Sequence, residues 1–547
     1  MPHDAGREAA TIADFVRASA DRHGDHEAIV LGSTRLSYRA LDAESQGLAR
    51  GLLAIGVGKG DRVGLFMADG PNWLRAWAAV GRIGAIAVTM STFSKGDELV
   101  RAIRHPDVVG VIFDRTIAGS DTVDRFESAL PQLCEQQSPH LRLAEAPFLR
   151  WLASSDAEAP QWAVDMRWIE AQASTGAAVD DDLLRAAERE VQPDDAAMMI
   201  YTSGSTSEPK GVVHSHRTVF VKTAHVARGM SFVEGERTYS PLPLFWVGGL
   251  INSLLPTLAH GGTVFCLERF DAGAVLELIG RERLTRIQAY PQHAAALAEH
   301  PALADCDVSS IRWAPPALMS GPIPAPPRGF FAALGMTETF GPYGWGLPDG
   351  EPSTMAVYIP IDDVEPGYEI KLVDESGALV AEGQQGEILV RGPTLTSGLY
   401  KRDRTESFDA DGFYRTGDLG VRSGPRIRFA GRKGNMIKRG GANVAPNEIE
   451  DLLLSADGVE QAFVVGIPDE LRGELIGAAV IARPGATLNG DALRQWAKSR
   501  ISVYKVPDLI VVMARDEVPR TASQKVSLPA LATVLSDAAK EIRCSIA

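Results

Sequence analysis

The most informative segment of the 547-residue chain is YTSGSTSEPKGV, residues 201–212. It follows a strand-like run at 198–201 and precedes a helical pattern at 214–230. Glycine and small hydroxyl residues let backbone N–H groups curl around an anion, and Lys210 adds a positive charge. A serine-rich turn alone would suggest a solvated loop, but the order ending in Pro-Lys-Gly favours a triphosphate site. The segment is not a Walker A loop, since Glu208 and Pro209 precede the lysine.

The chain before this segment alternates between short apolar runs and helical patterns. The strand-like runs are 61–68, 85–90 and 108–114, and the helical patterns between them are 72–84 and 97–105. Short apolar strands separated by helices predict parallel βαβ units. A further strand is predicted at 28–32. Residues 130–195 are acidic and weakly patterned, which predicts surface loops and helices.

The second half of the chain changes pattern twice. Residues 364–428 contain short strands and turns, which predict a small β-rich subdomain. After Gly431 a helix is predicted at the segment NEIEDLLLS, followed by a mixture of strands and helices. We therefore expect an α/β and α+β fold: a large N-terminal domain of residues 1–430, a hinge at 431–435, and a small, mobile α+β C-terminal domain of residues 436–547.

Composition excludes several classes of function. Lys and Arg number 55 and Asp and Glu 70, so the net charge is 55 − 70 = −15, which opposes binding to nucleic acid. The four cysteines include no CxxC pair, which is typical of a reduced, cytoplasmic protein. The N-terminus has no apolar signal-peptide region, and no apolar run approaches the ~18 residues of a membrane span. The sequence predicts no oligomeric state.

Segment 201–212 resembles the phosphate loop of the adenylate-forming (ANL) superfamily, which includes acyl-CoA synthetases, nonribosomal peptide synthetase adenylation domains and luciferases. Further segments resemble the other motifs of that superfamily, in the expected order. They are GMTE at 335–338, GEILVRG at 386–392, YRTGD at 414–418, the hinge and hairpin at 431–450, and PRTASQK at 519–525. The resemblance covers nearly the whole chain and identifies an acyl-CoA synthetase type of enzyme.

The resemblance implies a two-step reaction. A carboxylate attacks the α-phosphorus of ATP to give an acyl-adenylate, and the thiol of CoA then displaces AMP. Lys525 would act in the first step, together with Thr337, Glu338 and Lys210, and Glu338 would hold Mg²⁺, because a hard cation prefers carboxylate oxygen. The implied ATP-binding residues are Thr202, Ser203, Gly204, Ser205, Thr206, Lys210, Leu334, Gly335, Met336, Thr337, Asp418, Arg432 and Lys525.

For the second step, the resemblance implies that the C-terminal domain rotates about Gly434 and Asn435. Lys438, Gly440 and Gly441 would then contact CoA, where the glycines would let a pantetheine arm pass close to the backbone. A plain hairpin turn explains either glycine equally well.

Several residues depart from the family pattern. Trp246 stands where a histidine is usual in PLFWVGG, residues 243–249, which predicts a hydrophobic acyl pocket formed with Phe245, Gly248 and Phe340. Core packing of Trp246 is the alternative. Such a pocket offers no carboxylate for a substrate ammonium group, which opposes an amino-acid substrate. Leu334 stands at the usual adenine-stacking position.

Gly434, Asn435 and Gln524 also replace the usual residues of the hinge and of the terminal lysine motif. They put the second step in doubt and leave two alternatives: an acyl-AMP ligase that stops at the adenylate or loads a carrier protein, and a non-catalytic nucleotide-binding homologue.

Two weaker patterns are interpreted structurally. His214 and His216 lie two residues apart with no third ligand nearby, which predicts solvation or helix capping rather than metal binding. Gly204-Ser-Thr-Ser-Glu208 breaks the G-x-S-x-G nucleophile elbow, which excludes that type of hydrolase.

Overall fold

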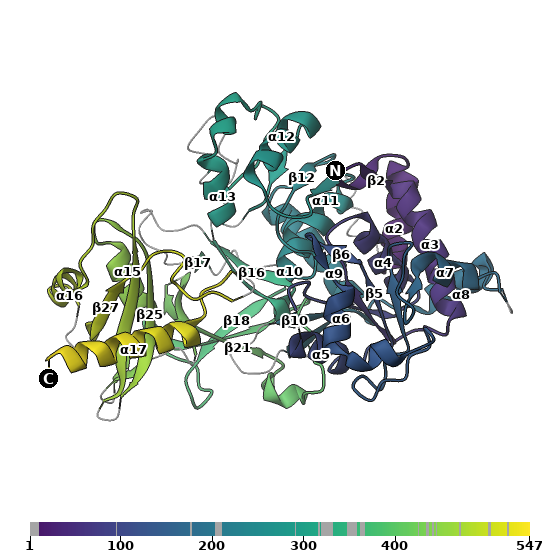
Figure 1. The fold of residues 1–547 in the computed structure, drawn as a ribbon. Coiled ribbons are helices and arrows are strands. Elements are labelled where there is room, and N and C mark those ends of the chain that lie inside the picture. The colour runs from purple at the N-terminus through teal and green to yellow at the C-terminus, as the bar shows by residue number, and fades with distance from the viewer. Residues whose placement is uncertain are drawn as a thin grey trace.

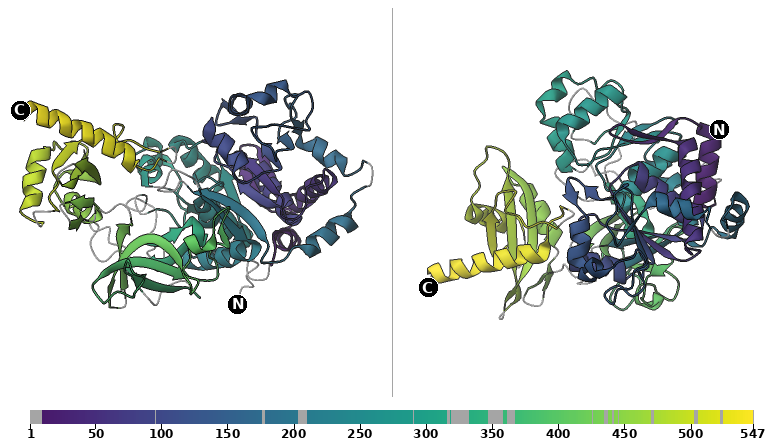
Figure 2. Two further views of the ribbon diagram at one scale, coloured as in Figure 1. Left: turned by 90° about the horizontal axis from the view of Figure 1, so that it is seen from below. Right: turned by 45° about the vertical axis from the view of Figure 1, so that its right-hand side comes forward.

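The computed structural model describes residues 10–94, 96–175, 178–202, 210–289, 291–315, 318, 332–346, 358–360, 367–424, 426–433, 437–439, 442–444, 446–469, 472–501, 505–521 and 524–546. Figure 1 shows a large body built from the N-terminal and central residues and a smaller, yellow-green body built from the C-terminal residues. Figure 2 shows the same division, with helix α17 (Leu528–Ile546) at the outer edge of the smaller body. The predicted mixed fold, with a large N-terminal and a smaller C-terminal domain, is confirmed.

The central sheet of the large domain carries the phosphate-loop segment near one edge. Its strands in spatial order are β20 (Gly398–Leu399), β11 (Lys210–Ser215), β10 (Ala196–Thr202), β4 (Ile86–Thr89), β3 (Arg62–Phe66), β5 (Gly110–Phe113), β8 (Trp151–Ser154) and β9 (Val164–Asp165). From β10 to β9 the pairing is parallel, and β11 and β20 are antiparallel. Every residue of β4, β5 and β8 is buried, as expected of parallel strands covered on both faces. The predicted βαβ units are confirmed.

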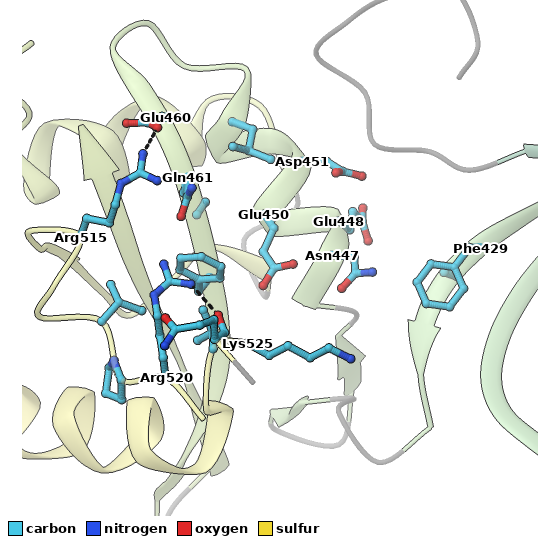
Figure 3. A pocket seen from close by; sticks show the side chains of 18 of the residues that line it. Phe429, Asn447, Glu448, Glu450, Asp451, Glu460, Gln461, Arg515, Arg520 and Lys525 are labelled. Atoms are coloured by element: carbon cyan, nitrogen blue, oxygen red, sulfur yellow. Dashed lines mark hydrogen bonds and ion pairs between the residues drawn. The ribbon is translucent and has the colours of Figure 1, made fainter. Parts of the chain in front are cut away.

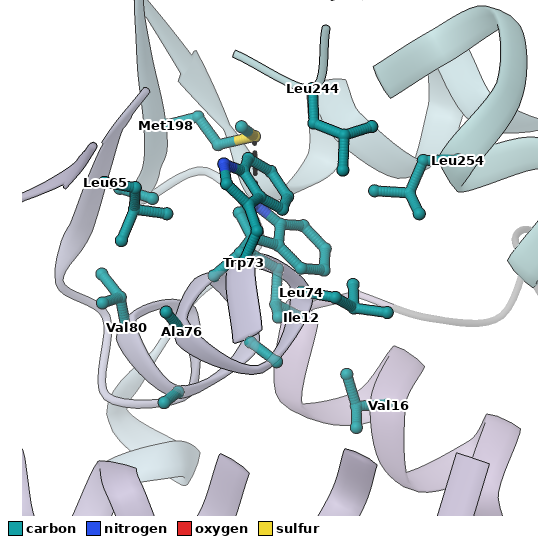
Figure 4. Packing of buried hydrophobic residues seen from close by; sticks show 14 of the residues in the cluster. Ile12, Val16, Leu65, Trp73, Leu74, Ala76, Val80, Met198, Leu244 and Leu254 are labelled. Atoms are coloured by element: carbon teal, nitrogen blue, oxygen red, sulfur yellow. Dashed lines mark hydrogen bonds between the residues drawn. The ribbon is translucent and has the colours of Figure 1, made fainter. Parts of the chain in front are cut away.

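Helix α4 (Pro71–Arg82), which joins β3 to β4, lies at the centre of the main hydrophobic cluster. Ten of its twelve residues are buried, so apolar residues surround it on nearly all sides. The rings of Trp73 and Trp77 stack with centroids 6.4 Å apart, and Trp77 Nε1 donates a hydrogen bond to the sulfur of Met198 in β10. Figure 4 shows Trp73 beside Met198, with residues of α2 (Ile12–His23) on the far side of the helix. The helix therefore links the sheet to the N-terminal helices.

Further helices surround the sheets of the large domain. They are α3 (Tyr38–Ala54), α5 (Asp97–Arg104), α6 (Val123–Ala129), α7 (Met166–Gln172), α8 (Asp181–Glu190), α9 (His216–Gly229), α10 (Val247–Gly249), α11 (Leu255–Ala259), α12 (Ala272–Glu282) and α13 (Pro291–Ala298). A second sheet has the order β14 (Arg286–Ile287), β12 (Arg237–Tyr239), β13 (Thr263–Cys266), β1 (Glu27–Leu31) and β2 (Thr34–Ser37). Strand β1 is the strand predicted at 28–32.

The predicted β-rich subdomain is an antiparallel sheet. Its order is β17 (Tyr358–Pro360), β22 (Arg426–Arg432), β21 (Tyr414–Ser423), β19 (Gln385–Arg391) and β18 (Glu369–Val373). A separate hairpin of β15 (Ala332–Met336) and β16 (Gly341–Gly346) carries the GMTE residues at its turn. Gly431 and Arg432 complete β22, and the predicted hinge residues Gly434 and Asn435 lie outside the described residues.

The smaller domain packs helices against a mixed sheet. Strands β24 (Ala442–Val444), β23 (Ile437–Arg439), β26 (Gly473–Ala482) and β25 (Val459–Asp469) follow one another, and β27 (Leu509–Val512) pairs with β26 in parallel. Helix α15 (Pro446–Leu454) is the predicted NEIEDLLLS helix, and it buries Ile449 and Leu453 completely. Helix α16 (Gly490–Lys498) follows β26.

Two expectations about local structure are wrong. Residues 130–195 were expected to be loops and helices, but Trp151–Ser154 forms the fully buried strand β8 inside the central sheet. Residues after Lys210 continue as strand β11 before α9 begins, and His214 and His216 are fully buried rather than solvated. His216 Nδ1 accepts a hydrogen bond from Ile12 N at 3.2 Å, at the start of α2, so it is the solvation alternative that is wrong. Across the part of the chain that the structure describes, no helix combines the length and apolar character needed to cross a membrane.

A buried arginine joins α4 to two other helices. Arg82 is fully buried, forms an ion pair with Asp42 of α3, donates to Ser45 Oγ at 3.0 Å, and lies 2.6 Å from Glu188 Oε1 of α8. Glu188 also pairs with Arg17, whose side chain is 44% exposed. The paired charges make this arginine tolerable in the core, and removal of one partner would leave Asp42 and Glu188 undercompensated.

We expect Arg82→Met to destabilise the large domain by about 3 kcal/mol, because it leaves the buried Glu188 and the partly buried Asp42 without their shared partner. The measurement is the urea-unfolding midpoint of the full-length protein. Arg39→Met is the matched control, since Arg39 pairs with Asp25 and both side chains are exposed, and its effect should stay within about 0.5 kcal/mol. Equal shifts in the two variants would contradict the prediction.

Candidate active site

A cavity of about 520 Å³ lies beside the end of β10, where the large domain adjoins Lys525 of the smaller domain. Its walls include residues from all the motifs described above: Thr202 and Lys210, Trp246 and Gly248, Gly335, Met336, Thr337 and Glu338, Glu387, the segment 414–417, Lys433, and Lys525. These residues are separated by up to 323 positions in the sequence, which is 525 − 202. The fold therefore gathers nine of the predicted site residues around one space.

Strands β10 and β11 bring both ends of the phosphate-loop segment to the cavity. Thr202 pairs with Lys210 in the antiparallel ladder, and both line the cavity. The predicted ligands Ser203, Gly204, Ser205 and Thr206 lie outside the described residues. Of the phosphate-binding residues predicted in this segment, the structure therefore describes Thr202 and Lys210.

The GMTE residues form a tight turn at the cavity wall. The 3₁₀ turn η4 (Thr337–Thr339) joins β15 to β16, and Thr339 Oγ1 donates to Gly341 O at 2.6 Å. A Cβ on Gly335 would lie 2.8 Å from the backbone of Gly341, so only glycine fits there. The turn directs Thr337 and Glu338 to the cavity.

His214 packs against Phe340, the residue that follows this turn. Its ring meets the Phe340 ring edge to face with centroids 4.7 Å apart. Burial lowers the pKa of His214 to about 3, and a backbone hydrogen bond with Thr337 offsets this only in part, so His214 is neutral. Sequence reasoning missed this role because a buried neutral histidine has no local signature.

Two carboxylates line the cavity. Glu338 is 7% exposed and accepts a hydrogen bond from the hydroxyl of Tyr414 at 3.1 Å. Glu387 of β19 was not predicted as a site residue, and its Oε2 lies 3.1 Å from Lys433 Nζ and 3.8 Å from Arg415. Both carboxylates therefore have donors facing them, which makes their burial tolerable.

The described residues that line the cavity carry more positive than negative charge. The basic residues are Lys210, Arg415, Lys433 and Lys525, and the acidic residues are Glu338 and Glu387. Because the whole chain has a net charge of −15, this local excess of positive charge indicates a site for an anion. The arrangement suits a polyphosphate more than a neutral ligand.

Lys525 is the contribution of the smaller domain to the cavity. It follows Gln524, whose φ of 63° is left-handed, and its carbonyl accepts a hydrogen bond from Thr521 N at 2.8 Å. Lys525 also lines a larger cleft of about 1660 Å³ between the two domains, formed with β22 and α15. Figure 3 shows Lys525 extending from the smaller domain towards the side of this cleft on which Phe429 lies. The lysine therefore lies where the cavity and the cleft meet.

Apolar residues form the opposite wall. Trp246, Val247 and Ile251 line the cavity beside Gly248 and Asn252. Behind them Phe245 meets Trp246 and Phe93 edge to face, with centroids 5.0 and 5.5 Å apart, and Phe93 lies 5.9 Å from Trp246. Phe93 is 42% exposed and was not predicted, because it lies in a loop far from any motif.

A buried acid holds the loop that carries Trp246. Asp69, just before α4, accepts a hydrogen bond from Leu244 N at 2.9 Å. Burial raises the pKa of Asp69 to about 7, and the bond from Leu244 opposes this only in part. The carboxyl group is thus held in surroundings that favour its neutral form.

Some predicted residues do not reach the cavity. Phe245 and Phe340 are almost completely buried and pack against other rings, and Leu334 packs in the core of the β-rich subdomain, so none of the three lines the cavity. Asp418 is buried in β21 opposite Arg432 and adjoins Gly417 of the cavity wall. The side chains of Arg432 and Lys438, and the residues Gly440 and Gly441, lie outside the described part of the chain.

Two family models match the chain. The model "AMP-binding enzyme" matches residues 16–400, and the model "AMP-binding enzyme C-terminal domain" matches residues 448–525. The chain belongs to the AMP-binding enzyme family. The predicted class, an AMP-forming acid–thiol ligase of the adenylate-forming superfamily, is confirmed.

Known proteins of this class resemble the chain over nearly its full length. A putative acyl-CoA synthetase, YngI of Bacillus subtilis (strain 168), is 29% identical and covers 94% of this chain and 95% of its own. The 3-[(3aS,4S,7aS)-7a-methyl-1,5-dioxo-octahydro-1H-inden-4-yl]propanoyl:CoA ligase of Mycobacterium tuberculosis (strain ATCC 25618 / H37Rv) is 30% identical. The alignment covers 93% of this chain and 95% of that ligase. The crystal structure of the anthranilate CoA ligase AuaEII with anthranoyl-AMP superposes with a TM-score of 0.77 at 22% identity. The superposition covers 98% of this chain and 99% of that chain.

We expect Asp69→Asn to flatten the dependence of stability on pH. Because the folded-state pKa of Asp69 is raised, the wild type loses stability as pH rises from about 4 to about 7, and the full penalty of the buried charge remains above that range. The amide keeps the acceptor for Leu244 without ionising. Thermal midpoints should therefore agree at pH 4 and favour the variant by a few degrees at pH 8.

Asp121→Asn is the matched control, since Asp121 is exposed in β7 (Ser120–Asp121) and accepts a similar backbone bond from Val123. Parallel midpoint profiles for wild type and Asp69→Asn between pH 4 and pH 8 would show that the prediction is wrong.

Proposed function

We propose that the chain is an ATP-dependent acyl-CoA ligase that activates a hydrophobic, bulky or alicyclic carboxylic acid. In the first step a carboxylate oxygen bonds to the α-phosphorus of ATP, and the bond to pyrophosphate breaks. In the second step the CoA sulfur bonds to the acyl carbon, AMP leaves, and the thiol proton passes to solvent. The observation that carries the proposal is that Lys525, Lys210 and Glu338 line one cavity with Trp246.

Lys210, Arg415, Lys433 and Lys525 support the assignment of the charged end of the cavity to ATP. Their positive charges face the same space and would neutralise phosphate oxygens. Lys525 would stabilise charge that builds on the α-phosphoryl oxygens as the carboxylate attacks, where a preplaced cation has its largest effect. Thr337 would contact the α-phosphate from the turn η4, and Asp418 with Arg432 would hold the ribose.

Glu338 fits a magnesium site. Its carboxylate is a hard oxygen donor, and the hydroxyl of Tyr414 orients one of its oxygens. Among the residues that the structure describes, no three His, Cys, Asp or Glu side chains converge on a possible metal position. Mg²⁺ held by Glu338 would therefore take its other ligands from phosphate and water, as this ion commonly does. Bound there, it would supply charge neutralisation to the phosphates.

The apolar wall supports a hydrophobic acid. Trp246, Val247 and Ile251 offer no charge to a polar tail, and the rings of Phe93 and Phe245 extend the apolar surface behind them. The 30% identical mycobacterial ligase acts, by its name, on a propanoate with a fused-ring substituent. The described residues at this wall include no carboxylate for a substrate ammonium, which opposes amino acids.

An acyl-AMP ligase is the second candidate. Gln524 adopts a left-handed conformation at a position where glycine is usual in the superfamily, and Gly434 and Asn435 replace the usual hinge residues. Release of AMP in the presence and absence of CoA distinguishes the two functions. A CoA-dependent burst of AMP with thioester formation supports the ligase, whereas adenylate that persists until a carrier protein is added supports the alternative.

The proposed function is tested with fatty, aromatic and alicyclic acids in an assay of pyrophosphate release. We expect release with ATP, Mg²⁺ and at least one hydrophobic acid. No release with any of the three classes would count against the proposal, and selective release with a charged amino acid would replace it.

We expect Lys525→Ala to lower ATP–pyrophosphate exchange at least about 100-fold, because it removes the cation proposed to meet the developing charge. Thiolysis of supplied acyl-adenylate by CoA should stay within about threefold of wild type, since the α-phosphoryl group is not attacked in that step. Lys540→Ala is the control, because Lys540 on α17 is 73% exposed and pairs with Asp537. Unchanged exchange in Lys525→Ala would remove the proposed role.

We expect Trp246→His to lower kcat/KM for a hydrophobic acid about tenfold and to leave KM for ATP within about twofold, because it replaces an apolar wall by a polar ring. Phe93→Ala should act in the same direction with a smaller effect, since Phe93 contacts Trp246 from behind. Trp168→His on α7 is the control, as Trp168 is 38% exposed and does not line the cavity. Equal changes for both substrates would contradict the assignment of this wall.

A further inference from the structure

A cluster of aromatic and charged side chains lies behind the two ends of the phosphate-loop segment and has no role in the reaction described above. Its centre is Tyr201, the residue before Thr202, which lines the cavity from β10. In the ladder between β10 and β11, Tyr201 is opposite Gly211 and Thr202 is opposite Lys210. The position of Tyr201 is therefore coupled through the backbone to both residues that reach the cavity here.

His105 holds the hydroxyl of Tyr201. His105 Nδ1 lies 2.6 Å from that hydroxyl, and the two rings meet edge to face with centroids 5.6 Å apart. Burial raises the pKa of Tyr201, and the neighbouring Tyr400 and Asp107 raise it further, so the hydroxyl keeps its proton. One hydrogen bond therefore joins the pair: the Tyr201 hydroxyl donates when His105 Nδ1 is unprotonated and accepts when Nδ1 carries the proton.

Tyr400 completes the cluster from the end of β20. Its backbone N–H donates to Gly211 O at 2.8 Å, its hydroxyl donates to Asp107 Oδ2 at 2.8 Å, and its ring lies 6.0 Å from His105. Lys401 Nζ donates to the other oxygen of Asp107 at 2.8 Å. Burial alone would raise the pKa of Asp107, but the hydrogen bonds from Lys401 and Tyr400 outweigh it and lower the pKa, so Asp107 is charged.

Gly211 leaves space for the side chain of Tyr201. A Cβ on Gly211 would lie 3.0 Å from the sulfur of Met199 and 3.2 Å from the hydroxyl oxygen of Tyr201. The missing side chain leaves room for the hydroxyl end of the Tyr201 ring beside Gly211, the residue that follows Lys210 in β11. The cluster therefore contacts the strand on each side of the loop: His105 acts on β10 through Tyr201, and Tyr400 acts on β11 through Gly211.

We propose that His105 and Tyr400 are positioning residues for ATP. They fix Tyr201 and Gly211, and thereby hold Thr202 and Lys210 at the separation that receives the triphosphate. The inference rests on the proposed function, because it takes the ligand of Lys210 to be a polyphosphate. It assigns a role to two residues, one directly after α5 and one directly after β20, that lie outside every motif of the sequence.

The experiment compares His105→Leu, Tyr201→Phe and the double variant in the full-length protein. Dissociation constants for ATP with Mg²⁺ are measured by calorimetry, and KM values for ATP and for the acid by pyrophosphate release. Each single variant should raise the dissociation constant and KM for ATP about fivefold to tenfold, with KM for the acid within about twofold. Because both changes break the same hydrogen bond, the double variant should be no worse than about twice the weaker-binding single variant.

Two further variants separate positioning from folding. His105→Gln keeps a group near Tyr201 that can donate or accept a hydrogen bond, and it should restore ATP binding to within about threefold of wild type. His23→Leu is the matched control, because His23 packs beside Tyr38 with centroids 5.1 Å apart, away from the cavity. Its ATP binding should equal that of wild type.

Different results would contradict the positioning role of the cluster and the proposed function on which it rests. Multiplicative effects in the double variant, equal changes in KM for ATP and acid, or lower thermal midpoints with unchanged ATP binding would each show that the cluster only stabilises the sheet edge. Failure of the wild type itself to bind ATP would instead overturn the proposed function.

Discussion

The cavity depends on the antiparallel pairing of Thr202 with Lys210. Strand β10 is fixed by its parallel ladder with β4 in the buried part of the central sheet, and β11 must return beside it. The return brings the lysine back to the point at which β10 ends. The same strand then carries His214 into the core, where it packs on Phe340 and supports the turn that holds Glu338. One hairpin thus sets the relative position of a cation and a carboxylate that are 128 residues apart, which is 338 − 210.

The electrostatics of the cavity are opposite to those of the whole chain. A net charge of −15 gives the protein a long-range field that repels anions, yet basic residues outnumber acidic ones among the described residues that line the cavity. Salt screens the long-range field within about 10 Å, whereas charges in a recessed wall act on a ligand at contact distance. Anion binding is therefore a local property that depends on the side chains being held together, and each of them comes from a different element of the fold.

Sequence patterns predicted the parts of the fold in which one periodicity dominates. The alternating runs at 61–114 became β3, α4, β4, α5 and β5, and the ordered motifs converged on one cavity. They did not predict the strand Trp151–Ser154, because a four-residue strand buried on both faces has no period of its own. Neither did they predict which motif residues face inwards.

Phe340 and Leu334 illustrate why orientation was not predictable. Both lie next to residues of the cavity wall, but Phe340 has a left-handed φ of 53°, which turns its ring away into the core, and Leu334 packs with the β-rich subdomain. A motif gives the residue types and their order, but the backbone conformation determines whether a side chain faces the cavity or the core. Glu387 and Lys433 were likewise not predicted as residues that face the cavity. Their ion pair joins β19 to the residue after β22, across 46 positions of the sequence.

The position of Lys525 links the chemistry to the arrangement of the two domains. Its backbone is held in a short turn closed by Thr521, in which Gln524 adopts a left-handed conformation that costs about 1 kcal/mol for a side-chain-bearing residue. The turn is fixed within the smaller domain, whereas the other cations of the cavity belong to the large domain or the segment that leaves it. Any change in the relative position of the two domains therefore moves this one cation away from the others. Coulomb attraction weakens as distance grows and as entering water raises the dielectric, so all the cations act together on a ligand only while the domains adjoin.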